Sequence, residues 1–179
     1  QGGNMKKCLI LAGFCILLCG CPNKKADFSN ADLTRQNFKN SKYSNTNFNN
    51  ANLTYSVLTG SKLSKADFTS ADLSYSVMNN VDMNRATVKN ARLIGINFTG
   101  ADLRNVDFSD SDLEGCIFTD ANLSGAKFCN TNLNNAIFHA ANLKKTDFTG
   151  SNVTIDALRN ARDLEKAILP YGTRYQKLK

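Results

Sequence analysis

Large apolar side chains recur at every fifth position from residue 28 to residue 153, without one insertion or deletion. A period of five fits neither the 3.6-residue repeat of an α-helix nor the two-residue repeat of a simple strand. A small residue stands two positions before each large one, and mostly polar residues fill the rest of the unit. The pattern therefore predicts that the five side chains of a unit point in, out, in, out and out, and that the last two residues form a turn at a corner.

The inward positions use few residue types. Across 26 units the large residue is Phe ten times and Leu eleven times, and the small residue is Ala twelve times, Ser six times and Thr three times. The position between them is Asp or Asn in 17 units. This alanine–aspartate–leucine-x-x pattern resembles the pentapeptide-repeat family over residues 26–153. The resemblance implies an all-β solenoid, a right-handed quadrilateral parallel β-helix in which four units form one square coil.

The order of the large residues gives separate support for four units per coil. From Leu93 to Phe148 Leu and Phe alternate strictly. Three units per coil would stack Phe on Leu, whereas four stack Phe on Phe. We therefore expect about 6.5 coils, stacked at the spacing of about 4.8 Å between paired strands. The narrow interior should be filled by side chains, which leaves no room for a substrate.

Reading the chain at a period of 20 residues defines four faces. Each is named here by the large residue of its first unit: face 1 starts with Phe28, face 2 with Leu33, face 3 with Phe38 and face 4 with Tyr43. The second residue of every unit should lie on the outer surface of its face. Contacts with other molecules are therefore to be sought among these second residues and the corner residues beside them.

The pattern changes after Val153. Thr154 is suited to cap the N-terminus of a helix from residue 155 to about residue 169, and Pro170 would stop it. Four apolar residues have helical spacing there: Leu158, Ala161, Leu164 and Ile168. We expect a short C-terminal capping helix within a cap and tail, residues 154–179.

The N-terminal segment has the features of an export signal. Lys6 and Lys7 precede an eleven-residue apolar run, residues 8–18, which is short for a membrane span. The run ends in Leu18-Cys19-Gly20-Cys21, which resembles a bacterial lipobox. The resemblance implies a signal peptide within residues 1–20, lipidation of Cys21 by acyl chains such as palmitate, a linker to residue 25, and a lipid anchor in the bacterial cell envelope. A buried N-terminal helix and an ordinary secretory signal are the alternatives.

The sequence does not suggest catalysis, a metal or a cofactor. His139, the only histidine, occupies an outward corner position, and the aspartates follow the repeat as turn residues. In the fourfold register Cys116 should point inward and Cys129 outward, so that the two do not form a disulfide. The spacing of these cysteines and of His139 is not that of a zinc site.

The net charge of +7 is unevenly placed. Residues 26–153 carry 12 basic and 12 acidic side chains, so the repeat is neutral. Face 4 nevertheless has a basic surface, in which seven cations outnumber Asp82 and Asp102: Lys42, Lys62, Lys65, Arg85, Arg104, Lys144 and Lys145. Two interpretations are open: charge drift on solvated faces, or contact with anionic lipid headgroups, polysaccharide or an acidic protein.

Face 3 differs in its second residues. Where other faces carry mostly Asp, Asn or a cation, it carries Val57, Val77, Ile117 and Ile137, with Tyr55 and Tyr75 at the corner leading into it. We call these six residues the apolar surface. β-Branched residues suit a parallel sheet in any case. Their confinement to one face favours instead a contact with a protein partner or a second copy of the chain.

The sequence therefore predicts a non-enzymatic envelope lipoprotein that acts as a binding or structural scaffold through the outer faces of a β-helix. Some members of the family that it resembles mimic duplex DNA and bind gyrase. That mimicry needs an acidic surface, which the neutral repeat with a basic face lacks, and nucleic acid is not expected as a partner. The other alternative is a secreted effector that contacts a host.

Overall fold

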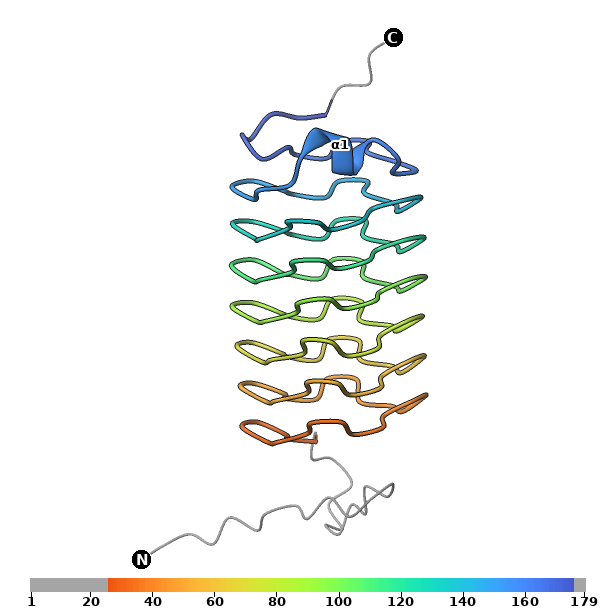
Figure 1. Ribbon diagram of the computed structural model, residues 1–179, viewed down its shortest axis with the longest axis vertical. Coiled ribbons are helices and arrows are strands. Elements are labelled where there is room, and N and C mark those ends of the chain that lie inside the picture. Colours follow the sequence, from red (N-terminus) through yellow and green to blue (C-terminus); the bar gives the residue numbers. More distant parts are fainter. Residues whose placement is uncertain (1–25, 176–179) are drawn as a thin grey trace, which may run out of the picture.

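The computed structural model describes residues 26–175, which form one stack of similar coils (Figure 1). Parallel bridges join residues that are 20 apart, from Asp27–Asn47 to Lys127–Asp147, and each strand is reduced to single bridged residues. A separation of 20 means that four pentapeptides complete each coil. The expected signal peptide, Cys21 and the linker to residue 25 lie outside the described residues, as do residues 176–179.

The backbone of each unit is satisfied in the same way. In residues 66–70 the N–H groups of Asp67, Phe68 and Ser70 donate to carbonyl groups of neighbouring coils, at 2.8 to 2.9 Å. The N–H of Thr69 instead donates to the Asp67 side chain, with 3.0 Å between nitrogen and Oδ1. This Asx turn recurs on all four faces and explains why Asp or Asn is so common at the second position.

The corners require a left-handed backbone at the fifth residue of each unit. Its φ lies between 52° and 74° through the regular coils, where Asn and Gly are frequent. The corner residues also stack along the molecule: a Cβ added to Gly100 would lie 2.5 Å from Oδ1 of Asn80, one coil earlier. Asparagine in one coil thus occupies the space that glycine leaves in the next.

The interior is a set of stacked columns of side chains. Phe48 and Phe68 stack with ring centroids 4.7 Å apart, and Phe128 and Phe148 with 5.2 Å. Rings of the opposite faces 1 and 3 meet edge to face across the interior, as Phe118 and Phe128 do at 5.8 Å. These stacks place Phe on Phe, as the fourfold register predicts. Burial of apolar surface and dispersion contacts along these columns stabilise the stack.

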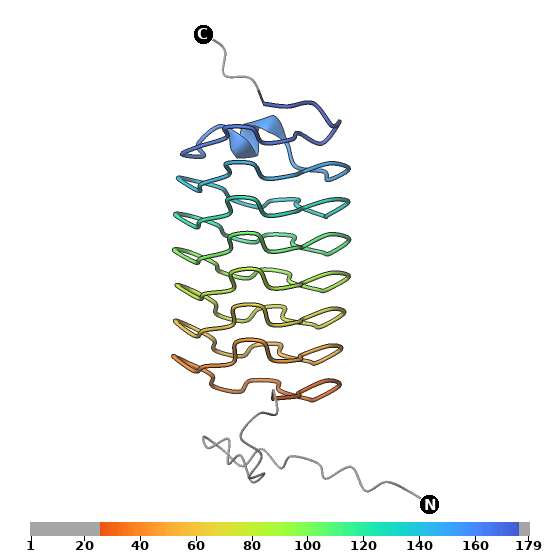
Figure 2. The ribbon, with the colours of Figure 1, turned by 180° about the vertical axis from the view of Figure 1, so that it is seen from behind.

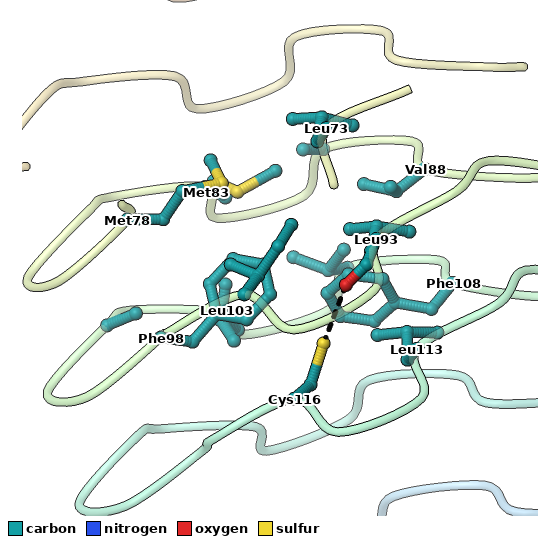
Figure 3. Close-up of a cluster of buried hydrophobic side chains, with 14 of the residues drawn as sticks. Leu73, Met78, Met83, Val88, Leu93, Phe98, Leu103, Phe108, Leu113 and Cys116 are labelled. Carbon is teal, nitrogen blue, oxygen red and sulfur yellow. Dashed lines mark hydrogen bonds between the residues drawn. The ribbon is translucent and has the colours of Figure 1, made fainter. Parts of the chain in front are cut away.

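The middle of the core contains smaller and more flexible side chains (Figure 3). Met78 and Met83 fill it where the Leu–Phe alternation is interrupted, and both are fully buried. The Cys116 thiol points inward and donates to the carbonyl oxygen of Leu93 at 3.0 Å. Burial raises the pKa of Cys116 to about 12. Cys129 is half-buried and both thiols are free, so the expectation that they do not pair is confirmed.

The C-terminal segment differs from the expected helix. Thr154 does cap a helix, and its side chain accepts a hydrogen bond from the N–H of Ala157, but α1 extends only over Ile155–Leu158. The expectation of a helix to about residue 169 is wrong. The chain returns to the coil path instead, and parallel bridges join Asn142 to Asp163 and Asp147 to Ile168.

These last bridges span 21 residues because one extra residue enters after α1. Leu158 is buried at the end of the column that contains Phe138, and the turn that follows it is longer by one residue than in the regular coils. The chain then doubles back through an antiparallel bridge between Ile168 and Arg174. From behind, α1 and this returning segment lie together at the same end of the stack (Figure 2). The coil path therefore ends with a partial coil and a short reversal.

Candidate functional site

The structure brings the apolar ladder of face 3 together on one side. Consecutive bridges link its second residues in the order 37, 57, 77, 97, 117 and 137. Asn97 lies between Val77 and Ile117 and divides the ladder into two apolar pairs. Val77 is 41% exposed and Ile137 is 47% exposed, whereas Val57 and Ile117 are half-buried. The apolar surface thus has two separate centres.

The two tyrosines form a stacked pair at the corner between faces 2 and 3. The rings of Tyr55 and Tyr75 have centroids 5.3 Å apart and planes at 16°, and each residue is about half exposed. Both have left-handed backbone, with φ of 59° and 60°. Bulky residues adopt this conformation rarely, at a cost of about 1 kcal/mol or more each. Two such residues in one corner column therefore indicate a selected feature.

Two neighbours of the tyrosines complete this column. The guanidinium carbon of Arg35 lies 5.8 Å from the centre of the Tyr55 ring, within the range of a cation–π contact. At the other end the Tyr75 ring lies over Gly95, where an added Cβ would come within 3.2 Å of two ring atoms. Arg35 and Gly95 were not among the expected site residues. Their separation of 20 residues from Tyr55 and Tyr75 is the signal that identifies them.

The basic surface of face 4 is less basic than the sequence count suggests. Arg104 forms a two-pronged ion pair with Asp102, at 2.8 and 2.5 Å, and its hydrogen bond lowers the pKa of Asp102 below the ordinary value. Lys144 pairs with Glu165, which lowers the pKa of Glu165 and raises that of Lys144. Because the terminal segment follows the coil path, Asp163, Glu165 and Lys166 also belong to this face.

Five cations of the basic surface enter none of the salt bridges within residues 26–175. All five are exposed: Lys42, Lys62, Lys65, Arg85 and Lys145. Lys42 and Lys62 are directly bridged partners in adjacent coils. The first three coils of face 4 therefore hold most of its uncompensated positive charge.

Groups that could support catalysis or hold a metal are sparse in the described part of the chain. His139 is exposed at a corner, as expected from its position in the repeat. Within residues 26–175 no group of three or more His, Cys, Asp or Glu side chains is arranged to hold a metal ion. In the same range no helix is long and apolar enough to cross a membrane. The outer ladders are thus the chemical features that the described fold presents.

Comparison with known proteins identifies the class of this fold. A model of pentapeptide repeats matches eight copies over residues 31–69, 51–90, 82–120 and 116–154. The chain therefore belongs to the pentapeptide-repeat family, whose architecture is the right-handed quadrilateral β-helix. Proteins of this family are generally structural or binding proteins.

Several solved structures are similar to the chain. HetL, a pentapeptide-repeat protein involved in heterocyst differentiation regulation from Nostoc sp. PCC 7120, is 25% identical over 85% of this chain and 78% of its own, with a TM-score of 0.48. QnrB1, a plasmid-mediated fluoroquinolone resistance protein, is 18% identical over 80% and 84%, with a TM-score of 0.35. A thylakoid-lumen protein of Arabidopsis thaliana is 23% identical over 85% and 84%, with a TM-score of 0.28. No curated protein matches the chain.

Proposed function

We propose that this protein is a non-enzymatic scaffold of the bacterial cell envelope, which binds a protein partner through the apolar surface of face 3. The observation that carries the proposal is the replacement of Asx residues by β-branched ones at four positions of a single ladder. Each replacement removes the side-chain acceptor that the second residue supplies elsewhere to the N–H of the fourth. At these four positions the local side-chain acceptor is given up and an apolar side chain is presented instead.

The stacked tyrosines support the same conclusion. Tyr55 and Tyr75 adopt strained left-handed corners and lie beside the Val57–Val77 pair. Aromatic side chains with an apolar body and a hydroxyl at the tip are enriched at protein interfaces. Pentapeptide corners do not require tyrosine, since Asn, Gly, Ser, Lys and Arg occupy equivalent corners of the same molecule. A partner lying flat on face 3 would cover the aromatic pair and both apolar pairs.

Photo-cross-linking in cells tests this contact. A photoreactive phenylalanine analogue at position 75 should capture a partner, because that side chain lies at the edge of the apolar surface. The matched control is position 90, an exposed left-handed corner on a different edge of the coil. Capture at 75 but not at 90, abolished by the double substitution Val77→Asn and Ile137→Asn, is the expected result. Equal capture at both positions, or capture that survives the double substitution, would contradict the proposal, whereas capture of the chain itself would identify the partner as a second copy.

The envelope location rests on the proposed lipid anchor at Cys21. The basic start, the apolar run and the lipobox-like end support it. The intact mass of the native protein from the detergent-soluble membrane fraction should match residues 21–179 plus acyl chains, and Cys21→Ala should abolish incorporation of labelled palmitate. An unlipidated mass in the soluble fraction would overturn the location and leave the face 3 contact to be tested elsewhere.

The basic surface of face 4 suggests a second, electrostatic contact with anionic lipid headgroups. The five exposed cations without salt bridges favour it, and four of them lie in the first three coils, at the end of the stack that begins with residue 26. Binding to vesicles of phosphatidylglycerol should fall with rising salt and weaken in the double variant Lys62→Glu and Lys65→Glu. Binding that is unchanged in that variant would remove this contact.

A further inference from the structure

A cleft of about 510 Å³ opens at the C-terminal end of the stack, where the last residues on the path of face 4 meet the returning chain. One wall consists of residues 161–166 of the terminal coil, and Arg174 and Tyr175 of the returning chain also line the cleft. Arg159 closes the side next to α1. Its volume is within the range of small-molecule sites, about 300 to 1,000 Å³.

The reversal of the chain creates this cleft. The N–H of Leu169 donates to the carbonyl of Thr173 at 2.7 Å, and the N–H of Tyr175 donates to that of Ala167 at 2.8 Å. These bonds bring Arg174 and Tyr175 back over the terminal coil. Residues 161–166 of the terminal coil and this returning segment together line the cleft.

Arg162 occupies a notable position in this arrangement. Asp163 is bridged to Asn142, so Arg162, the residue before Asp163, stands in the register of Ala141 one coil earlier, and its N–H donates to the Ala141 carbonyl at 2.8 Å. Ala141 is fully buried, and in the regular coils this position is filled mainly by Ala, Ser or Thr. In the terminal coil it holds an exposed arginine that lines the cleft.

The charges around the cleft leave two guanidinium groups without a carboxylate partner. Four cations line it: Arg159, Arg162, Lys166 and Arg174. Its carboxylates are engaged elsewhere, since Asp163 accepts the N–H of Glu165 and Glu165 pairs with Lys144 and Lys166. Arg159 pairs with Asp156. Neither Arg162 nor Arg174 takes part in any salt bridge within residues 26–175.

We propose that this cleft binds a phosphate group, with Arg162 of the terminal coil and Arg174 of the returning chain as the main ligands. The planar, multidentate guanidinium suits the tetrahedral oxygens of phosphate, and two such groups would neutralise a dianion. The phosphate could belong to a small soluble phosphomonoester or to a lipid headgroup. The cleft is at the far end of the stack from residue 26, about 30 Å away at the usual spacing of paired strands.

Calorimetric titration of the purified lipidated protein with inorganic phosphate and with glycerol 3-phosphate tests the site. Arg162→Ala and Arg174→Ala should each weaken binding at least tenfold, whereas Arg92→Ala, an exposed arginine of face 2 outside the cleft, should leave it unchanged. Arg162→Ala introduces the residue that Ala141 already provides one coil earlier. Its thermal melting should therefore stay at or above that of the native protein, which separates lost binding from lost folding.

A second arm distinguishes the source of the phosphate. Co-sedimentation with phosphatidylglycerol vesicles is measured for the native protein, Arg162→Ala and Arg92→Ala. Saturable binding of the soluble compounds that depends on Arg162 supports a phosphomonoester site. Vesicle binding that depends on Arg162, without binding of the soluble compounds, supports a headgroup site. The proposal is overturned if neither kind of binding depends on Arg162, or if Arg92→Ala loses as much binding as Arg162→Ala.

Discussion

The outer ladders of face 2 and face 3 are built on the same backbone but use their second residues differently. On face 2, Asp32, Asn52 and Asp72 each accept the N–H two residues later. On face 3, Val57, Val77, Ile117 and Ile137 have no side-chain acceptor to offer. The fold tolerates both because the bonds between coils hold the second residue in place whatever its side chain. The repeat thus separates stability, which lies in the backbone and core, from recognition, which the outer residues can change.

The largest effect on stability should come from placing a charge on the inner side of face 3, compared with the same charge on its outer side. Phe118→Asp places an unpaired carboxylate in the phenylalanine stack and should lower the free energy of unfolding by about 5 kcal/mol or more. Ile117→Asp, one residue earlier but on the outer surface, should have little effect on thermal melting. Similar melting of the two variants would refute the inward assignment of position 118.

Removing an Asx turn from face 2 should have a smaller effect. Asn52 accepts hydrogen bonds from both the N–H and the hydroxyl of Thr54, at 3.0 and 2.8 Å. Asn52→Val should lower the free energy of unfolding by about 1 kcal/mol in urea denaturation, because both donors lose their acceptor. Asn52→Asp retains the acceptor and serves as the control. Equal losses of stability in the two variants would mean that the amide group of Asn52, and not the Asx turn, stabilises the protein.

The reverse exchange on face 3 sharpens the comparison. Val77→Asn should create an Asx turn to the N–H of Asn79 and raise the free energy of unfolding by about 0.5 to 1 kcal/mol, while removing the most exposed apolar side chain of its pair. The free energy of unfolding measured by urea denaturation should then rise, whereas the yield of photo-cross-linking at position 75 should fall. A variant that is less stable than the native protein would show that valine serves the fold at this position.

The smallest expected effect on stability concerns the small inward residue at the first position of each unit. Ser56 of face 3 is fully buried, and its hydroxyl finds no partner among the described residues, whereas the Ser61 hydroxyl of face 4 donates to the Leu58 carbonyl at 2.6 Å. Ser56→Ala should raise the free energy of unfolding by about 0.5 kcal/mol, and Ser61→Ala should lower it. A loss of stability in both variants would place a hydrogen-bond partner at Ser56.

The regular coils could be predicted from the sequence because one period determines every position in them. The fourfold stack of phenylalanines, the inward Cys116 and the placement of Tyr55 and Tyr75 at one corner all follow from counting by five and by 20. Counting by 20 also places Asn97 between Val77 and Ile117, so the division of the apolar surface could be predicted. How far each β-branched side chain is exposed could not be counted, since exposure depends on the neighbouring corner residues.

The terminal segment was less predictable because two periods coexist in it. Leu158, Ala161, Leu164 and Ile168 have helical spacing, yet Leu164 and Leu169 are five apart, and Asp163 precedes Leu164 as the Asx residue precedes the large one in a regular unit. The extra residue after α1 hides this second pattern from a strict count by five. The Lys144–Glu165 ion pair, which reduces the charge of face 4, and the cleft with Arg162 follow from this coil path and were missed for the same reason.

The bridges between residues 20 apart also limit how such a gene can change in length. Loss of one pentapeptide would keep every downstream residue correctly inside or outside, but it would rotate the rest of the molecule by a quarter turn. If the lost unit lay between Val77 and Ile137, the residues stacked after Val77 would come from another face. Ile137 would then no longer lie on the same side of the molecule as Val77. Duplication or loss of a whole 20-residue block would lengthen or shorten the apolar surface without breaking it.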